Sequence, residues 1–371
     1  MYIKSVELKN FRNYKNEFFE FNPKINIIYG NNAQGKTNLL ESIYFLALSK
    51  SHRSINDKDL IKENENECKV TANAILNNFP TSLEIKITNN RKIYRIDNNY
   101  IKSLNNYLSN LKVIIFFPED LEIIKSSPDI RRRYLNIQIS QLNKTYYKIL
   151  NEYNKLLKIR NDILKKNLKD NNLDKQYFEI ITAYLIDKAS YLYCMRDKYI
   201  ERINKLIGNY YKKISTFDNL KLKYITNLDV EKYDYENNKL LLKKRFDELR
   251  SAELKSGVTL IGPQKDDFEF ILDGKNLKNY GSQGQQRMAI LALKITEIEV
   301  FTEIGNETPI LLLDDVFSEL DEFKKNNLLD LLKDDIQTII TTTDLNNISK
   351  EIIDISKLIK IEDGKCMTRG E

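Results

Sequence analysis

The chain has 371 residues, of which 42% are hydrophobic and 30% are charged, and its formal net charge is +6. This balance excludes a disordered chain, and three widely spaced cysteines indicate neither a disulfide framework nor a zinc site. No apolar run approaches the roughly 18 residues that cross a bilayer, and the N-terminus lacks the apolar core of a secretory signal, so we expect a cytoplasmic protein without membrane contact.

The first predicted elements are strands at 4–11, 19–21 and 25–29, followed by a phosphate-binding loop and an apolar helix. The loop has the pattern G-x-x-x-x-G-K-T, in which backbone N–H groups surround phosphates, the lysine reaches the β- and γ-phosphates, and the threonine binds Mg²⁺. A tight turn without a ligand is the alternative, which the flanking strand and helix disfavour. The loop residues are Gly30, Asn31, Asn32, Ala33, Gln34, Gly35, Lys36 and Thr37.

His52 is the only histidine, and it follows the apolar helix together with Arg53. Without a second histidine it cannot form a paired metal site, so we interpret it as a surface loop residue. The sequence assigns no role to either residue. General-base chemistry would fall to a carboxylate or to positioned water. Further β-rich segments complete an N-terminal lobe over residues 1–120.

Residues 121–255 are predicted to form a helical arm inserted between the N-terminal lobe and a C-terminal lobe. Apolar residues recur at helical spacing over 139–163, with Arg160 as an interruption, and again over 178–206, which predicts an antiparallel helical hairpin. Residues 121–215 contain 20 Lys and Arg against 10 Asp and Glu. The excess suits DNA phosphates or, equally, solvated helix faces. The densest cluster, Arg131, Arg132 and Arg133, is the candidate DNA contact.

Residues 256–371 are predicted to form the C-terminal lobe, which completes the parallel sheet. The segment Gly257–Leu272 returns to strand, interrupted by the polar loop Gly262–Asp267, to which no role is assigned. A long apolar helix then begins near Gln285, and the small residues before it leave its N-terminus suited to an anion.

A buried apolar strand at 310–313 delivers Asp314 and Asp315 to the carboxyl edge of the sheet. Asp314 is placed to hold Mg²⁺ together with Thr37, and Asp315 lies closer to the γ-phosphate, where an attacking water needs an acceptor. The alternative for these acids is the N-cap of the following helix.

Six motifs in this order resemble the RecF family of bacterial recombination mediators, whose head is of the ABC type shared with SMC-like repair proteins. They are LKNFRNY (8–14), GNNAQGKTNLLE (30–41), SHR (51–53), PEDLEIIKSSPDIRRRYL (118–135), GSQGQQR (281–287) and LLLDDVFSELD (311–321). The resemblance implies an α/β fold, an ABC-type P-loop ATPase head with a mixed sheet and an inserted α-helical arm.

The resemblance also implies roles for individual residues. Gly30 to Thr37 correspond to Walker A, and Asp314 with Asp315 to Walker B. Asp321 corresponds to the D-loop, and Arg12 and Asn13 to nucleotide contacts. The signature that touches the nucleotide of a second subunit corresponds to Ser282, Gly284 and Gln285.

Three positions depart from the transporter-type pattern. Asp315 stands where a glutamate is usual, Thr343 where a switch histidine is usual, and the segment FFPEDL offers no counterpart for the usual glutamine. The first two departures argue for slow hydrolysis of ATP.

The function implied is that of an ATP-dependent DNA-binding protein of recombinational repair, replication restart and the SOS response. ATP and Mg²⁺ are the expected cofactors, and the ATP-induced homodimer is a DNA clamp at single-stranded gaps and junctions that helps to load a recombinase. RecR and RecO are expected partners, and the ATPase activity is expected to be weak and DNA-dependent. The alternatives are an ABC transporter subunit, which should have the switch histidine, and an SMC-like organiser, which needs a far longer coiled coil.

Overall fold

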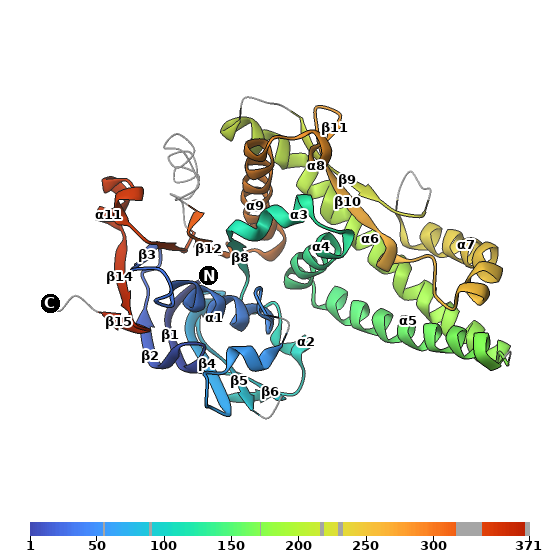
Figure 1. Cartoon of the computed structure of the whole chain (residues 1–371), viewed down its shortest axis with the longest axis horizontal. Coiled ribbons are helices and arrows are strands. Elements are labelled where there is room, and N and C mark those ends of the chain that lie inside the picture. Colours follow the sequence, from blue (N-terminus) through green and yellow to red (C-terminus); the bar gives the residue numbers. More distant parts are fainter. Residues whose placement is uncertain are drawn as a thin grey trace. The chain divides into compact units, whose positions relative to one another are not determined.

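Figure 1 shows the computed structural model, which describes residues 1–54, 56–88, 91–170, 172–215, 219–228, 233–316 and 336–367. The chain forms two compact units. The first comprises Met1–Leu121, Lys213–Thr216 and Ile290–Glu371, and the second comprises Glu122–Lys212 and Phe217–Ala289. The second unit is therefore an insertion between parts of the first.

The first unit contains an antiparallel sheet with strand order β2-β1-β4-β5-β6-β7. Alternate residues of β4 are buried, as the two-residue period of a strand requires. Asn77 and Asn78 join β4 to β5, and Asp97 and Asn98 join β6 to β7; all four have positive φ, which suits tight hairpin turns. The strands are β1 (Tyr2–Phe11), β2 (Tyr14–Glu20), β4 (Glu67–Leu76), β5 (Phe79–Thr88), β6 (Arg91–Ile96) and β7 (Asn99–Ile101).

The second sheet of this unit is parallel except for its last strand, with the order β15-β14-β3-β13-β12-β8. Every residue of the central strands β12 and β13 is buried, because a parallel sheet is covered on both faces. The strands are β3 (Ile25–Tyr29), β8 (Val113–Phe116), β12 (Ile310–Asp314), β13 (Thr338–Thr342), β14 (Lys357–Glu362) and β15 (Lys365–Met367). The residues that follow β3, β12 and β13 therefore share one edge.

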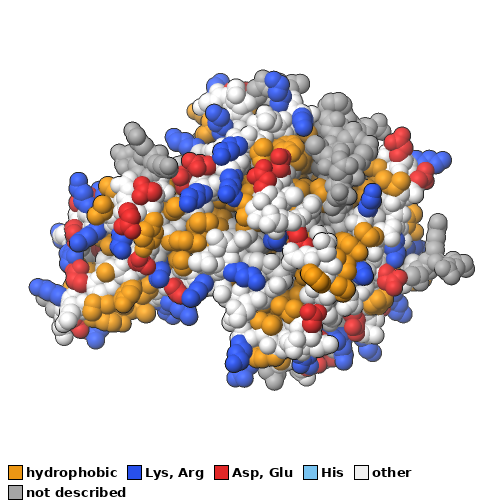
Figure 2. Space-filling view, turned by 180° about the vertical axis from the view of Figure 1, so that it is seen from behind, with side chains coloured by type: hydrophobic (Ala, Val, Ile, Leu, Met, Phe, Trp, Pro, Cys, Tyr) orange, Lys and Arg blue, Asp and Glu red, His pale blue; other side chains and the backbone are white. Residues whose placement is uncertain are grey.

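Helix α1 (Lys36–Leu48) begins at that edge, and all of its residues are buried except Thr37 and Asn38. The unit also contains α2 (Leu104–Tyr107), α11 (Lys350–Ile355) and the end of α9 (Gln283–Gly305). None of the described helices is both long and apolar enough to span a membrane. Charged side chains of both signs are interspersed over the face shown in Figure 2.

The second unit is mainly helical and contains the predicted hairpin. Helices α5 and α6 run antiparallel, because Glu152 of α5 pairs with Lys188 of α6 whereas Arg160, two turns later, contacts the earlier Thr182. A three-stranded antiparallel sheet has the order β11-β10-β9. The elements are α3 (Glu122–Lys125), α4 (Pro128–Leu142), α5 (Lys144–Asp170), α6 (Lys175–Ile214), β9 (Leu220–Ile225), α7 (Tyr235–Ser256), β10 (Asp267–Leu272), β11 (Lys275–Asn276), α8 (Leu277–Tyr280) and the start of α9.

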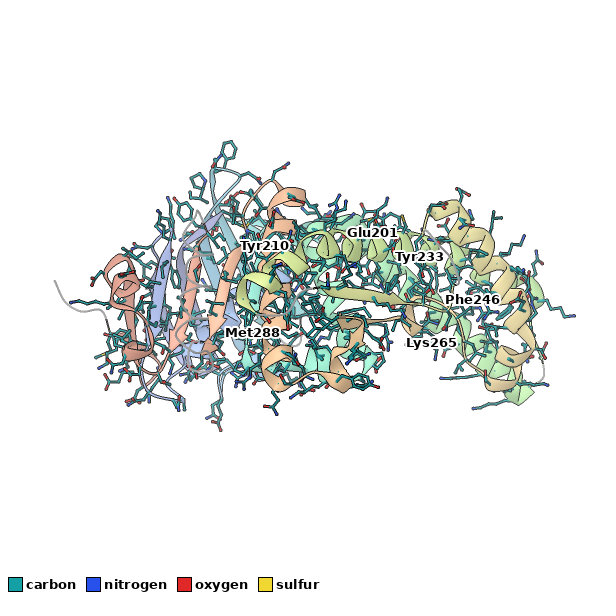
Figure 3. All side chains as sticks on the ribbon, turned by 90° about the horizontal axis from the view of Figure 1, so that it is seen from above. Glu201, Tyr210, Tyr233, Phe246, Lys265 and Met288 are labelled. Atoms are coloured by element: carbon teal, nitrogen blue, oxygen red, sulfur yellow. The ribbon has the colours of Figure 1, made fainter. Side chains whose placement is uncertain are left out.

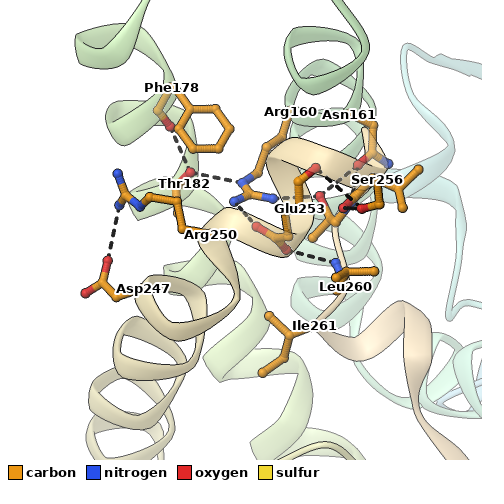
Figure 4. A network of polar contacts seen from close by, with 12 residues as sticks. Arg160, Asn161, Phe178, Thr182, Asp247, Arg250, Glu253, Ser256, Leu260 and Ile261 are labelled. Atoms are coloured by element: carbon orange, nitrogen blue, oxygen red, sulfur yellow. Dashed lines mark hydrogen bonds and ion pairs between the residues drawn. The ribbon is translucent and has the colours of Figure 1, made fainter. Parts of the chain in front are cut away.

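Arg160, which interrupts the apolar pattern of α5, is the centre of a buried polar network (Figure 4). Its guanidinium donates to Glu253 of α7 at 2.6 Å and to Thr182 of α6 at 3.0 Å, and it lies over the ring of Phe178 at 4.6 Å. Both charged side chains are almost fully buried. Such a pair is costly to break, since one charge is then left buried without its partner. The network joins α5, α6 and α7.

The second compact unit extends to Ala289, whereas the helical arm is predicted from the sequence to end at residue 255. Residues 257–289 belong to the second unit, because β10 pairs with β9 along its whole length. The strand expected over Gly257–Leu272 is present only as β10. The loop before β10 is bound to the arm helices through Asp266, which pairs with the buried Arg196 at 2.8 Å. The polar residues of this loop thus fasten the second unit together.

Candidate nucleotide-binding site

The phosphate-binding loop connects β3 to α1, and its conformation requires glycine at both ends. Gly30 has φ +150°, and a Cβ atom there would lie 2.2 Å from the carbonyl oxygen of Ile361 on β14. Gly35 has φ +116°, and its Cβ would lie 2.7 Å from Asn13 Nδ2. Larger residues would displace the loop from the sheet edge.

Neighbouring turns hold the loop from outside. Asn13 Nδ2 donates to the carbonyl of Gln34 at 3.1 Å, and the backbone N–H of Gly364 donates to the same carbonyl at 3.2 Å. The buried Tyr14 hydroxyl donates to the carbonyl of Gly35 at 2.9 Å. Asn13, which the resemblance assigns to the nucleotide, thus contacts the loop backbone.

Lys36 is 7% exposed and folds back over the loop. Its Nζ donates to the carbonyls of Gly30 at 2.7 Å and Asn31 at 2.8 Å. Burial lowers the pKa of Lys36, and the nearby carboxylates of Asp315 and Asp314 oppose that shift. The ammonium group is held against the loop by two carbonyl oxygens, where it is suited to a phosphate.

Thr37 and Asp314 come together, as predicted from their positions after β3 and at the end of β12. Thr37 Oγ1 donates to Asp314 Oδ1 at 3.0 Å, and Thr341 Oγ1 of β13 donates to the same oxygen at 2.7 Å. Burial raises the pKa of Asp314, and the hydrogen bonds from Thr341 and Thr37 counteract this. A hydroxyl and a carboxylate are the hard oxygen ligands that Mg²⁺ prefers, so the pair fits that ion.

Asp315 follows in the left-handed region at φ +50°, and its backbone N–H donates to Thr341 Oγ1 at 3.0 Å. Its side chain lines the same cavity as Lys36. The turn after β12 thus directs the second acid toward the cavity. Asp321, expected in the D-loop, lies outside the described residues.

These groups line a cavity of about 460 Å³ that lies wholly within the first unit. Part of the cavity wall is not predicted by the sequence. This part consists of His52 and Arg53 after α1, Pro118 and Glu119 after β8, and Thr343 after β13. The linking segment FFPEDL therefore reaches the cavity without the usual glutamine. Thr343 reaches it where a switch histidine is usual.

A buried carboxylate fixes the turn that carries His52 and Arg53. Glu41 of α1 accepts hydrogen bonds from Arg12 at 2.8 and 2.6 Å and from the Ser51 hydroxyl at 2.5 Å. Ser51 Oγ in turn accepts from the backbone N–H groups of Arg53 at 2.9 Å and Ser54 at 2.8 Å. Burial would raise the pKa of Glu41, but the hydrogen bonds from Arg12 and Ser51 outweigh it and lower that pKa.

The ring of His52 lies between those of Tyr44 and Phe117, with centroid distances of 5.3 and 4.9 Å. It is therefore part of the packed wall of the cavity and not only a surface loop residue. The Arg53 guanidinium donates to Asn38 Oδ1 at 3.0 Å. An exposed cation is thus held in the wall of the cavity.

The predicted signature caps a helix in the second unit. Ser282 precedes α9, its backbone N–H donates to Gln285 Oε1 at 2.8 Å, and the backbone N–H of Gln285 donates to Ser282 Oγ at 3.2 Å. This reciprocal capping box starts the helix at Gln283, slightly earlier than expected. Ser282 and Gly284 are exposed, so the end of the helix faces solvent.

The arginine cluster predicted to contact DNA does not offer three surface cations. Arg131 is 5% exposed and donates to both carboxylate oxygens of Asp267, at 2.6 and 2.9 Å. Arg132 donates to the carbonyl of Asp266 at 2.7 Å. Only Arg133 of the three is exposed. The cluster is drawn inward because α4 packs against β10, whose first residue supplies the carboxylate.

Comparison with known proteins places these features in a family. The pattern of the RecF/RecN/SMC N-terminal domain matches residues 2–367. The chain is 38% identical to DNA replication and repair protein RecF of Listeria monocytogenes serotype 4b over 98% of this chain and 99% of the relative, and 38% identical to that of a Geobacillus species over 98% of each.

Solved structures agree with the sequence comparison. The structure of the recombination mediator protein RecF with ATP, from the RecFOR pathway, has a TM-score of 0.92 and 34% identity over 99% of this chain and 97% of that one. A Pyrococcus furiosus Smc head domain has a TM-score of 0.55 and 18% identity over 98% of this chain and 95% of that chain, which shows the fold alone.

Proposed function

The chain belongs to the RecF family of DNA replication and repair proteins, and from this premise we propose that it is an ATP-dependent DNA-binding protein of recombinational repair and replication restart. The observation that carries the proposal is the convergence of Lys36, Thr37 and Asp314 on one cavity at the carboxyl edge of the parallel sheet. The related RecF structure with ATP supports ATP as the ligand.

In this proposal Lys36 leaves its two loop carbonyls for the β- and γ-phosphates, and the loop N–H groups surround the phosphates. Thr37 and Asp314 would hold Mg²⁺, which supplies charge neutralisation between the phosphates. Asp315 accepts a proton from the attacking water. Its side chain is one methylene shorter than the usual glutamate, so hydrolysis is slow and ATP acts mainly as a switch. Asn13 acts by bracing the loop, and Arg12 by holding Glu41.

We further propose that ATP joins two copies of the chain. The exposed, capped end of α9 would meet the γ-phosphate bound by the other copy, with Ser282 Oγ and the adjoining N–H groups as donors. Asp321 would face the partner as part of the D-loop. Two identical sites close the arrangement, so the assembly stops at a dimer.

The ATP-bound dimer would act as a DNA clamp at single-stranded gaps and junctions and help to load a recombinase in the cytoplasm, together with RecR and RecO, as part of the SOS response. Thr343 in place of a switch histidine and the modest length of α5 and α6, 27 and 40 residues, disfavour a transporter subunit and an SMC-like organiser.

One experiment tests the proposal as a whole. ATP affinity, oligomeric state and DNA affinity are measured on the same preparation with and without ATP and Mg²⁺. Wild-type protein should bind ATP, dimerise and then bind DNA, whereas Lys36→Ala should lose all three. ATP binding by Lys36→Ala at wild-type strength would contradict the assignment of the loop.

A further inference from the structure

Helix α6 carries an exposed row of cations along one side. Lys198, Arg202 and Lys205 recur at spacings of four and three residues, so they lie on one face over a rise of about 10 Å. The buried residues Ile200, Ile203 and Ile207 occupy the opposite face. Figure 3 labels Glu201 and Tyr210 on the same stretch of α6.

Strand β9 is fastened alongside this stretch of helix. Asn204 Nδ2 donates to the carbonyl of Leu222 at 2.8 Å, and the backbone N–H of Leu222 donates to Asn204 Oδ1 at 2.7 Å. Gly208, one turn later, lies opposite Leu220: a Cβ atom on it would be only 3.6 Å from the carbonyl oxygen of Leu220. The side chain of Asn204 therefore satisfies the edge of β9 that β10 does not use, and the positions of the two elements are fixed.

Alternation along β9 places two further lysines beside the row on α6. Leu220 and Leu222 are buried, whereas Lys221 and Lys223 are exposed on the other face of the strand. The buried faces of α6 and β9 both point into the core of the second unit, so their exposed faces form one surface. We call Lys198, Arg202, Lys205, Lys221 and Lys223 the basic face.

Acidic side chains lie near the basic face without forming an ion pair with it in the described part of the chain. Among the described residues none of its five side chains is in an ion pair, although Glu201 lies on the same side of α6 and Glu269 lies opposite Lys223 in the sheet. Asp197 is half-buried on the side of α6 toward β9. Like charges one helical turn apart repel one another. Five fixed cations therefore favour an external polyanion.

We propose that the basic face binds the sugar–phosphate backbone of DNA and reads no bases. Lys221 and Lys223 lie about 7 Å apart on a strand, and the helical row continues the line of charge over about 10 Å. The face has point charges for phosphates but no aromatic side chain among its five residues for stacking on bases, so contacts should be independent of sequence. This inference rests on the proposed DNA-binding function and names the surface that serves it, in place of the inward-drawn cluster at Arg131.

The test uses the full chain with ATP and Mg²⁺ and a fluorescent gapped duplex of arbitrary sequence, titrated between about 50 and 200 mM salt. The variant replaces four exposed cations by glutamine: Arg202→Gln, Lys205→Gln, Lys221→Gln and Lys223→Gln. Its affinity for DNA should be at least about tenfold below that of wild type. The slope of log affinity against log salt should become shallower by about two to four, roughly 0.9 per lost phosphate contact.

A matched control removes the same charge from α5. Its four lysines are equally exposed and are in no ion pair within the described part of the chain: Lys155→Gln, Lys158→Gln, Lys165→Gln and Lys166→Gln.

The control should bind DNA within about twofold of wild type, and both variants should retain ATP binding and dimerisation. Equal losses in the two variants, or an unchanged salt slope in the first, would overturn the basic face as the DNA site. Failure of wild-type protein to bind DNA with ATP would instead overturn the proposed function itself.

Discussion

Replacing Thr341 by valine tests whether strand β13 tunes the proposed metal site at Asp314. The Thr341 hydroxyl donates to Asp314 at 2.7 Å and accepts from the backbone N–H of Asp315 at 3.0 Å, and both contacts are lost in a side chain of the same shape. The backbone N–H of Asp315 then loses this acceptor, which costs about 1–3 kcal/mol of folding stability. Removing a partner that orients a metal ligand weakens metal binding by about 10- to 100-fold, or about 1.4–2.7 kcal/mol.

The assay is a Mg²⁺ titration of the binding of a fluorescent ATP analogue at fixed protein concentration. Thr341→Val should require about 10- to 100-fold more Mg²⁺ for half-maximal effect. Burial already raises the pKa of Asp314, and losing Thr341 raises it further. Because only the carboxylate binds Mg²⁺, the deficit should grow as the pH falls.

Thr338→Val is the matched control, since Thr338 is also buried in β13 but its hydroxyl has only a long contact of 3.5 Å to the carbonyl of Ile336. If Thr341→Val needs no more Mg²⁺ than Thr338→Val, the hydroxyl is only a packing element. The inference that Thr341 orients Asp314 as a metal ligand would then be refuted.

Three further substitutions probe separate parts of the molecule. Asp315→Asn should leave ATP binding intact, slow hydrolysis and prolong the ATP-bound dimer, as seen by single-turnover kinetics; wild-type turnover would exclude Asp315 as the acceptor. Ser282→Arg should bind ATP as a monomer and bind DNA poorly, and normal ATP-dependent dimers by light scattering would contradict the shared site. Arg160→Met should lower the free energy of unfolding in urea by about 3–5 kcal/mol, because Glu253 is left buried and charged. The double variant with Glu253→Gln should recover part of that loss, and no recovery would show that the pair is not coupled.

The parts of the site that the sequence predicts are those set by short-range spacing. Gly30 to Thr37 form one continuous loop between a strand and a helix, and Asp314 ends an apolar strand. In a parallel sheet both ends meet at one edge, so the contact of Thr37 with Asp314 follows from topology, although 277 residues separate them. The helical hairpin is predicted for a similar reason, since its 3.6-residue period is local.

Contacts between polar residues that are far apart in the sequence cannot be predicted from local spacing. Arg131 finds Asp267 136 residues later, and Arg196 finds Asp266 70 residues later. In the sequence these arginines look like surface cations, and the acids look like a loop of the head. The first pair is turned inward by the packing of α4 against β10, and the second by the position of α6 beside the loop that precedes β10. The same packing moves the boundary of the second unit to about residue 290.

Arg12 shows that a residue which a family pattern assigns to the nucleotide has a structural partner that the pattern does not reveal. The pattern assigns Arg12 to the nucleotide, but a carboxylate as buried as Glu41 needs a cation, and Arg12 supplies it through two hydrogen bonds. The same carboxylate binds Ser51, whose hydroxyl orders the turn that ends in Arg53. Arg53 lines the cavity together with Lys36, and Arg12 is connected to the site through Glu41 and the position of that turn.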